Sequence, residues 1–137
     1  MNFADKFKDI FQEFACRLFG YDRLLPSNTG VEGGEVANKL ARKWGYLVKG
    51  IPRNAAVTVF CHNNFWGRTL AAISSSNDSL ATQDHGPLLP GFKSVPFSDL
   101  PSLSEALGPD SMSFVLNLGL KINLCFHFDT SHTITTE

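Results

Sequence analysis

The feature that most constrains the fold is the segment at residues 55–61 (AAVTVFC), which is apolar, rich in β-branched side chains and without strict alternation. Such a segment is typical of a strand that is buried on both faces, as the strands of parallel sheets are. Apolar residues with helical spacing precede it at residues 36–48, and a short helical segment follows it at residues 69–75. Helices that alternate with strands predict an α/β fold with a mainly parallel sheet.

The remaining elements are predicted from periodicity and from turn residues. An apolar stripe with helical spacing predicts a helix over residues 3–18 that ends at Gly20. Three glycines within residues 27–35 predict a turn-rich loop. Residues 76–91 show little periodicity, so we expect a long ordered loop with a functional role. The other expected elements are strands at residues 92–96 and 113–120, a short helix capped by Asp99, and a polar, frayed tail at residues 129–137.

Length and charge restrict the class of protein. The chain has 137 residues, which suits one globular domain. Its 12 basic residues are balanced by 13 acidic ones, so no basic field would attract nucleic acid. Residues 1–9 lack the apolar core of a signal peptide, and the most apolar stretch, residues 114–128, is too short to span a bilayer. We therefore expect neither nucleic acid nor a membrane as a partner.

The cysteines and histidines predict no metal site. Cys16, Cys61 and Cys125 are odd in number and far apart, which favours reduced thiols in an intracellular compartment over a disulfide framework. Cys125 and His127 would point the same way on a strand, but two ligands are too few for zinc. Ordinary packing is the expected role of both side chains.

A first candidate binding segment is the glycine-containing loop before the helix at residues 36–48. Glycines let the backbone approach a ligand closely, and the amides and dipole of a helix N-terminus favour a phosphate. Asn28 and Thr29 add polar side chains to this loop. Its pattern is neither a Walker nor a dinucleotide-binding motif, so a plain turn that leads into a helix is the alternative.

The second candidate segment is Phe65-Trp66-Gly67-Arg68, directly after the buried strand. Ligands of open α/β sheets gather at the carboxyl ends of strands. The two aromatic rings could stack on a flat heterocycle, and Arg68 could hold a carboxylate with two hydrogen bonds. In the alternative interpretation both rings fill the core and Arg68 is a solvated surface charge.

These segments resemble the ornithine aminotransferases, a family of fold-type I, class-III enzymes that use pyridoxal phosphate. The resemblance covers about residues 3–115, and the order and spacing of its segments fit the family. They are NTGVEGGEVANKLARKWGYLVKGI, NNFWGRTLAAISSS and GPLLPGF. The resemblance implies that the chain forms part of the large domain, with a mainly parallel sheet and flanking helices.

Site residues follow from the resemblance position by position. It implies that Thr29, Gly30 and Val31 lie in the loop that binds the phosphate of pyridoxal phosphate. Phe65 corresponds to the ring that stacks on the pyridine of the cofactor. The resemblance further implies two substrate-binding residues, of which Trp66 would line the pocket and Arg68 would pair with a carboxylate.

The resemblance also implies a reaction and its partners. The δ-amino group of ornithine would be transferred to 2-oxoglutarate, which gives glutamate-5-semialdehyde and glutamate. Pyridoxal 5′-phosphate would be the cofactor and act as electron sink. Family members are homodimers, and animal members lie in the mitochondrial matrix. Without a presequence in this chain, the cytoplasm is the alternative compartment.

The resemblance ends near Leu116. The family's Schiff-base lysine, the aspartate on the pyridine nitrogen and the carboxyl-terminal domain would all follow that point. We therefore expect a fragment truncated at both ends and inactive alone, with residues 1–116 as a partial large domain and residues 117–137 as a divergent tail. Lys121, among apolar neighbours, could form a Schiff base if desolvated, but we favour an edge-strand charge and predict no catalytic residue.

Two functional hypotheses from different classes remain. The chain derives either from an ornithine aminotransferase, or it is a non-catalytic truncated product that binds phosphate compounds weakly or pairs with a full-length subunit. In either case an incomplete parallel sheet would expose an apolar edge. We expect residues 114–128 to be prone to aggregation for this reason.

Overall fold

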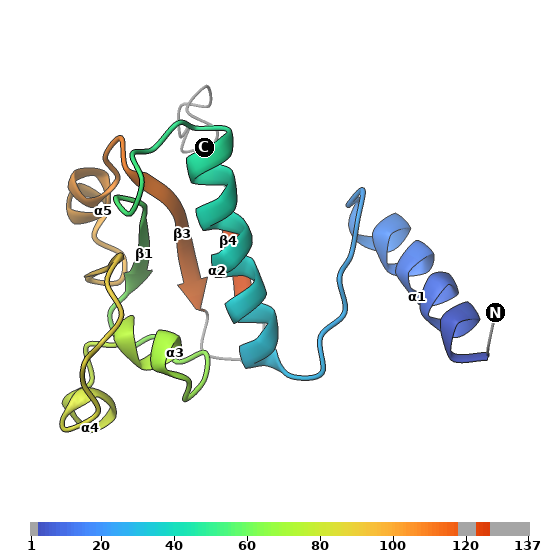
Figure 1. The fold of residues 1–137 in the computed structure, drawn as a ribbon, viewed down its shortest axis with the longest axis horizontal. Helices are drawn as coiled ribbons and strands as arrows, with labels where there is room; N and C mark the ends of the chain where they lie inside the picture. Colours follow the sequence, from blue (N-terminus) through green and yellow to red (C-terminus); the bar gives the residue numbers. More distant parts are fainter. Residues whose placement is uncertain (1–2, 118–122, 127–137) are drawn as a thin grey trace.

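The computed structural model describes residues 3–117 and 123–126 (Figure 1). The expected tail at residues 129–137, Lys121 and His127 lie outside the described residues. The elements, in chain order, are α1 (Phe3–Phe19), α2 (Gly30–Leu47), β1 (Val57–Cys61), α3 (Leu70–Ser74), α4 (Ser79–Thr82), β2 (Phe92–Val95), α5 (Leu100–Ala106), β3 (Ser111–Asn117) and β4 (Asn123–Phe126).

The strands form one sheet in the order β2-β1-β3-β4. β1 is parallel to both of its neighbours, and Val59 is in register with Lys93 of β2 and with Phe114 of β3. β4 is antiparallel to β3 and adds an edge strand that the sequence did not predict. The mainly parallel sheet and the buried strand at its centre are confirmed.

Helices cover both faces of β1, as its apolar sequence predicts. Val59 and Cys61 pack with Val95 against residues of α5 and the turn after it. The opposite face carries Phe60, which packs against α3, and Thr58, whose hydroxyl donates to Asn38 Oδ1 of α2 at 2.9 Å. Figure 1 shows the sheet between α2 and α5. The result is a three-layer arrangement with β1 at its centre.

The glycine-containing segment is helical, so the loop predicted over residues 27–35 is wrong from Gly30 onward. α2 begins at Gly30, and Thr29 is its N-cap. The Thr29 hydroxyl accepts from the Glu32 N–H at 3.2 Å, and the Glu32 carboxylate accepts from the Thr29 N–H at 3.1 Å. This reciprocal capping box satisfies the N–H of the N-cap and one N–H of the first turn, and it starts the helix despite its glycines.

α1 is confirmed as a helix, and Gly20, with a φ of 72°, ends it. Figure 1 shows α1 set apart from the sheet, at the end of an extended connection. It packs on that connection, where Gln12 Nε2 donates to the Leu24 carbonyl at 2.6 Å. Its apolar stripe is exposed, with Phe14 at 53% and Leu18 at 62%. Among the described helices, none is long and apolar enough to cross a membrane.

Candidate functional site

The candidate site lies at the carboxyl end of β1, in the loop of residues 62–68. The chain turns sharply there because Asn63 adopts a φ of 58°, and its N–H donates to Asn77 Oδ1 at 2.8 Å. The loop ends at Thr69, whose hydroxyl caps α3 by accepting from the Ala72 N–H at 3.2 Å. The loop therefore stands where open α/β sheets bind their ligands.

Trp66 packs beneath this loop. Its side chain is 6% exposed, and its indole stacks on the Phe60 ring with centroids 5.9 Å apart and 7° between the planes. The indole N–H donates to Ser75 Oγ at 2.8 Å. One of the two predicted rings thus fills the core, although Trp66 also borders the adjacent cavity. Its contact with a substrate stays a prediction.

Phe65 and Arg68 are the exposed members of the same loop. The Phe65 side chain is 63% exposed. The Arg68 guanidinium carbon lies 5.4 Å from the centroid of the Phe65 ring, within cation–π range. A flat ligand that stacked on Phe65 would lie within reach of this guanidinium. The pair can therefore offer a ring face and a carboxylate-binding cation side by side.

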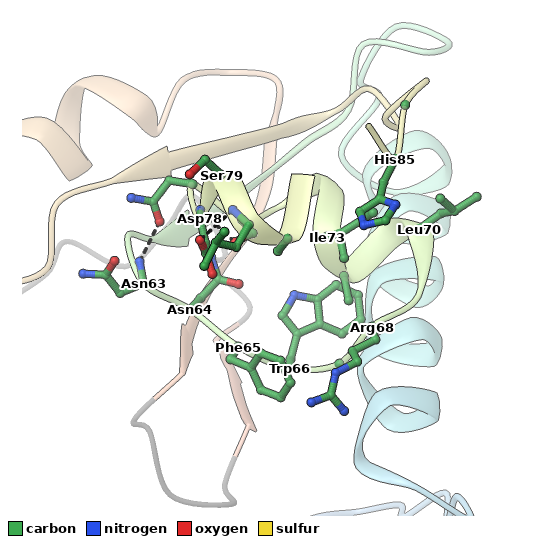
Figure 2. A pocket seen from close by; sticks show the side chains of 17 residues that line it. Asn63, Asn64, Phe65, Trp66, Arg68, Leu70, Ile73, Asp78, Ser79 and His85 are labelled. Carbon is green, nitrogen blue, oxygen red and sulfur yellow. Dashed lines mark hydrogen bonds between the residues drawn. The ribbon is translucent and has the colours of Figure 1, made fainter. Parts of the chain in front are cut away.

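A cavity of about 920 Å³ opens beside the loop (Figure 2). Phe65 and Arg68 line it, together with Asp78 and His85 from the segment after α3. Small-molecule sites have cavities of about 300–1,000 Å³, so this one is large enough for a cofactor or substrate. The segment predicted as a long ordered loop at residues 76–91 contains the short helix α4 and supplies much of this lining.

The N-terminus of α2 forms the second part of the site. The capping box uses the amide of Glu32, and the Gly33 N–H donates to the Thr29 carbonyl at 3.2 Å. The Gly30 and Val31 amides head the helix and take no part in the hydrogen bonds of the described residues. A Cβ added at Gly30 would meet nothing within 4 Å, so the backbone is open to a ligand.

The two segments that the sequence singled out are brought into contact. A Cβ on Gly67 would lie 2.2 Å from Val31 Cγ2, so only glycine lets the loop rest against the first turn of α2. A Cβ on Gly34 would lie 2.5 Å from a ring carbon of Trp66. Each segment has its own hollow, since Val31 lines a second cavity of about 390 Å³. The loop and the helix N-terminus are nevertheless one packed unit.

Asn64 and Ser75, which no sequence pattern singled out, hold the loop from within. Asn64 is 7% exposed and Ser75 is 3% exposed. The Asn64 side-chain amide donates to the carbonyls of Cys61 and Ser75, both at 2.9 Å. A polar Asn-x-Trp sequence after a buried strand was the available signal, but the partner eleven residues away depends on the fold.

Cys61 is the buried free thiol at the end of β1, next to the candidate site. Burial raises the pKa of the Cys61 thiol, which keeps it protonated. No group of three or more His, Cys, Asp or Glu side chains in the described part of the chain could hold a metal ion.

Comparison with known proteins places these features in one family. The family Aminotransferase class-III matches residues 2–113. The mitochondrial ornithine aminotransferase of Drosophila ananassae is 51% identical over 107 residues, which are 77% of this chain and 25% of that protein. The chain thus spans about a quarter of the length of the curated relatives that it matches.

Solved structures agree with this assignment. The ornithine aminotransferase of Toxoplasma gondii, whose structure reveals partial occupancy of PLP at its active site, has a TM-score of 0.74 and 46% identity. The match covers 76% of this chain and 25% of that one. The acetylornithine aminotransferase of Elizabethkingia anophelis has a TM-score of 0.60 and 40% identity, over 79% of this chain and 26% of its own. The predicted fold, part of the large α/β domain of such enzymes, is confirmed.

Proposed function

The chain belongs to the class-III aminotransferase family, and from that premise we propose that it carries the phosphate-binding and ring-stacking elements of an ornithine aminotransferase site. The contact between its two candidate segments is the observation that supports this most directly. Because Gly67 rests on Val31 and Gly34 lies under Trp66, helix amides and an exposed aromatic ring are presented from one packed unit.

The residues present fit the cofactor that the family implies. The open backbone at Gly30 and the amides of Gly30 and Val31 suit a phosphate, and the Thr29 hydroxyl lies at the same helix end. Phe65, exposed beside the larger cavity, suits the face of a pyridine ring. When bound, pyridoxal 5′-phosphate supplies the electron sink for amino-group transfer.

The substrate side of the site is proposed from Arg68 and Trp66. Arg68 would bind a substrate carboxylate with two parallel hydrogen bonds, next to the ring held on Phe65. Trp66 would border the substrate with the edge of its ring, since its N–H already donates to Ser75. The proposed substrates are ornithine and 2-oxoglutarate. The name of the Drosophila relative favours ornithine over related amino acids.

The assembly and the location are proposed for the whole protein. We place it in the mitochondrial matrix, which the name of the Drosophila relative supports, and in a homodimer as the family resemblance implies. We further propose that residues 1–116 belong to the large domain. Residues beyond that point add the antiparallel strand β4 to its sheet.

Calorimetric titration with pyridoxamine 5′-phosphate tests the cofactor proposal, because this compound lacks the aldehyde that would react with surface lysines. We expect saturable binding that inorganic phosphate weakens by competition. Phe65→Leu should weaken binding by about 3- to 10-fold, the usual value of one aromatic stacking contact. Phe97→Leu is the matched control, since Phe97 is also an exposed aromatic but lies outside the site.

Equal affinity of the two leucine variants would contradict the proposal, as would an absence of binding by the unaltered chain. Turnover is tested separately, by adding ornithine and 2-oxoglutarate to the chain with pyridoxal phosphate. Formation of glutamate would support catalysis by the chain itself. Binding without glutamate would support the non-catalytic alternative, in which the chain binds the cofactor but completes no reaction.

A further inference from the structure

Phe65 and Arg68 are exposed, but their neighbours in the loop are packed. Arg68 follows Gly67, which rests against Val31 of α2. Phe65 lies between Asn64 and Trp66, which are 7% and 6% exposed. The loop thus alternates between side chains that anchor it and side chains that it presents to the cavity. The orientation of the presented pair depends on what holds the anchors.

Both anchors are held by Ser75, the residue that ends α3. Its Oγ accepts from the Trp66 indole N–H at 2.8 Å, and its carbonyl accepts from Asn64 Nδ2 at 2.9 Å. Its hydroxyl hydrogen has two acceptors within range, the Ala72 carbonyl at 2.8 Å and Asn64 Oδ1 at 3.2 Å. Asn64 in turn donates to the Cys61 carbonyl at 2.9 Å. One 3% exposed serine therefore links the end of β1, the loop and the end of α3.

The side-chain N–H donors of Trp66 and Asn64 are all taken by protein acceptors. An indole has one donor, and that of Trp66 is taken by Ser75. Both amide hydrogens of Asn64 are taken by the two carbonyls. Loss of the Ser75 hydroxyl would leave a buried indole N–H without an acceptor, and the indole could regain one only by moving. Such a movement would carry its neighbour Phe65 with it.

We propose that Ser75 is a positioning residue that sets the orientation of Phe65 and Arg68 through Trp66 and Asn64. This inference rests on the proposed function, because those two side chains are the ones assigned to the cofactor ring and the substrate carboxylate. Ser75 touches neither ligand group itself. The hydroxyl is not needed to end α3, since the Ser75 backbone N–H makes the cap, with the Ala72 and Ile73 carbonyls as acceptors.

Ser74 provides a matched control in the same turn. Its hydroxyl donates to the Leu70 carbonyl at 2.6 Å and accepts from the Leu89 N–H at 2.8 Å. Neither bond involves Trp66 or Asn64. Ser74→Ala and Ser75→Ala therefore remove the same group from adjacent positions of one helix end, but only Ser75→Ala opens the link to the loop.

The Nε–H signal of Arg68 in a ¹⁵N NMR spectrum measures how its side chain lies relative to the Phe65 ring, and it needs no bound cofactor. The Phe65 ring shifts this signal because the guanidinium carbon lies 5.4 Å from the ring centroid. An Arg68→Lys spectrum assigns the signal, and a Phe65→Leu spectrum gives its position without the ring. We expect Ser75→Ala to move the signal toward the Phe65→Leu position, and Ser74→Ala to leave it in place. Trp66→Phe breaks the same hydrogen bond from the other end and replaces Ser75→Ala if that variant does not fold.

Affinity for pyridoxamine 5′-phosphate provides the second readout. We expect Ser75→Ala to raise the dissociation constant by no more than the about 3- to 10-fold change expected for Phe65→Leu, since a displaced ring loses at most its stacking contact. Adding Ser75→Ala to Phe65→Leu should have little further effect, because the serine acts through that ring. If the unaltered chain does not bind this compound, the proposed function fails, while the Arg68 signal still decides the positioning role. An Arg68 signal that stays in place in Ser75→Ala and Trp66→Phe, or that moves as far in Ser74→Ala, would overturn the inference.

Discussion

At the scale of single residues, two adjacent glycines of α2 have different reasons to be glycine. A Cβ on Gly33 would meet nothing within 4 Å, whereas a Cβ on Gly34 would lie 2.5 Å and 2.9 Å from two carbons of the Trp66 ring. Gly34 therefore makes room for the indole that anchors the loop. Gly33 only adds conformational freedom to the unfolded chain.

Alanine at these two positions should have opposite effects on stability. Gly33→Ala should raise the free energy of unfolding by about 0.5–1 kcal/mol, because alanine is the better helix former. Gly34→Ala should lower it by about 1–3 kcal/mol, because the new methyl group displaces the buried indole. Urea denaturation of both variants measures the difference. Stabilisation by both would show that Trp66 does not pack on α2.

At the scale of residues, the sequence indicates side chains that follow a local pattern, and their binding roles stay predictions. Phe65 and Arg68 follow a recognisable strand, and the structure places both beside a cavity. The partnership of Asn64, Trp66 and Ser75 could not be predicted, because it depends on α3 folding back over the end of β1.

At the scale of elements, a buried hydrogen bond ties α2 to the centre of the sheet. The Thr58 hydroxyl, 0% exposed, donates to Asn38 Oδ1 at 2.9 Å. Thr58→Val should lower the free energy of unfolding by about 1–3 kcal/mol, because it leaves the buried Asn38 Oδ1 without its donor. The double variant Thr58→Val with Asn38→Leu should regain part of the free energy of unfolding that Thr58→Val alone loses, as measured by urea denaturation. If the double variant loses more free energy of unfolding than the two single variants together, the hydrogen bond between Thr58 and Asn38 does not explain the loss in Thr58→Val.

The cap of α5 makes part of the stability depend on pH. Hydrogen bonds from the Ser102 hydroxyl, at 2.6 Å, and from its backbone N–H, at 3.1 Å, hold the pKa of Asp99 below its usual range. A carboxylate with a lowered folded-state pKa stabilises the fold above its unfolded pKa, so this contribution is lost as the pH falls below about 4. The stability difference between the parent chain and Asp99→Asn should shrink toward pH 3 in urea titrations. A difference independent of pH would exclude this role for Asp99.

The start of a helix could be predicted where its capping residue was recognised in the sequence. The Asp99 cap and the following proline predicted α5, and the structure confirms it. The start of α2 was missed because three glycines suggested a loop, although the pattern Thr29-x-x-Glu32 indicates a capping box. The capping box determines the structure because it satisfies amides that glycines alone would leave to water.

At the scale of the whole molecule, α1 shows what local sequence cannot predict. Its apolar stripe correctly predicted a helix, since periodicity reports the conformation of a segment. The stripe alone does not show which surface, if any, covers it. In the structure Ile10, Phe11 and Phe14 are 59%, 48% and 53% exposed. Tertiary placement depends on surfaces elsewhere in the molecule, and periodicity does not encode them.

The exposed stripe of α1 leads to a prediction about association and stability. Large apolar side chains that stay in water favour association, by about 1.5–3 kcal/mol for each one that becomes fully buried. Phe14→Gln with Leu18→Gln should therefore reduce aggregation of the chain, measured by light scattering. The melting temperature should not fall, because neither side chain packs in the core. Leu80→Gln is the matched control, since Leu80 is 86% exposed but stands outside the stripe, and it should change neither quantity. A fall of several degrees in the double variant would mean that α1 is packed against the sheet or against a second copy in solution, since large losses of stability follow from replacing buried apolar groups and not exposed ones.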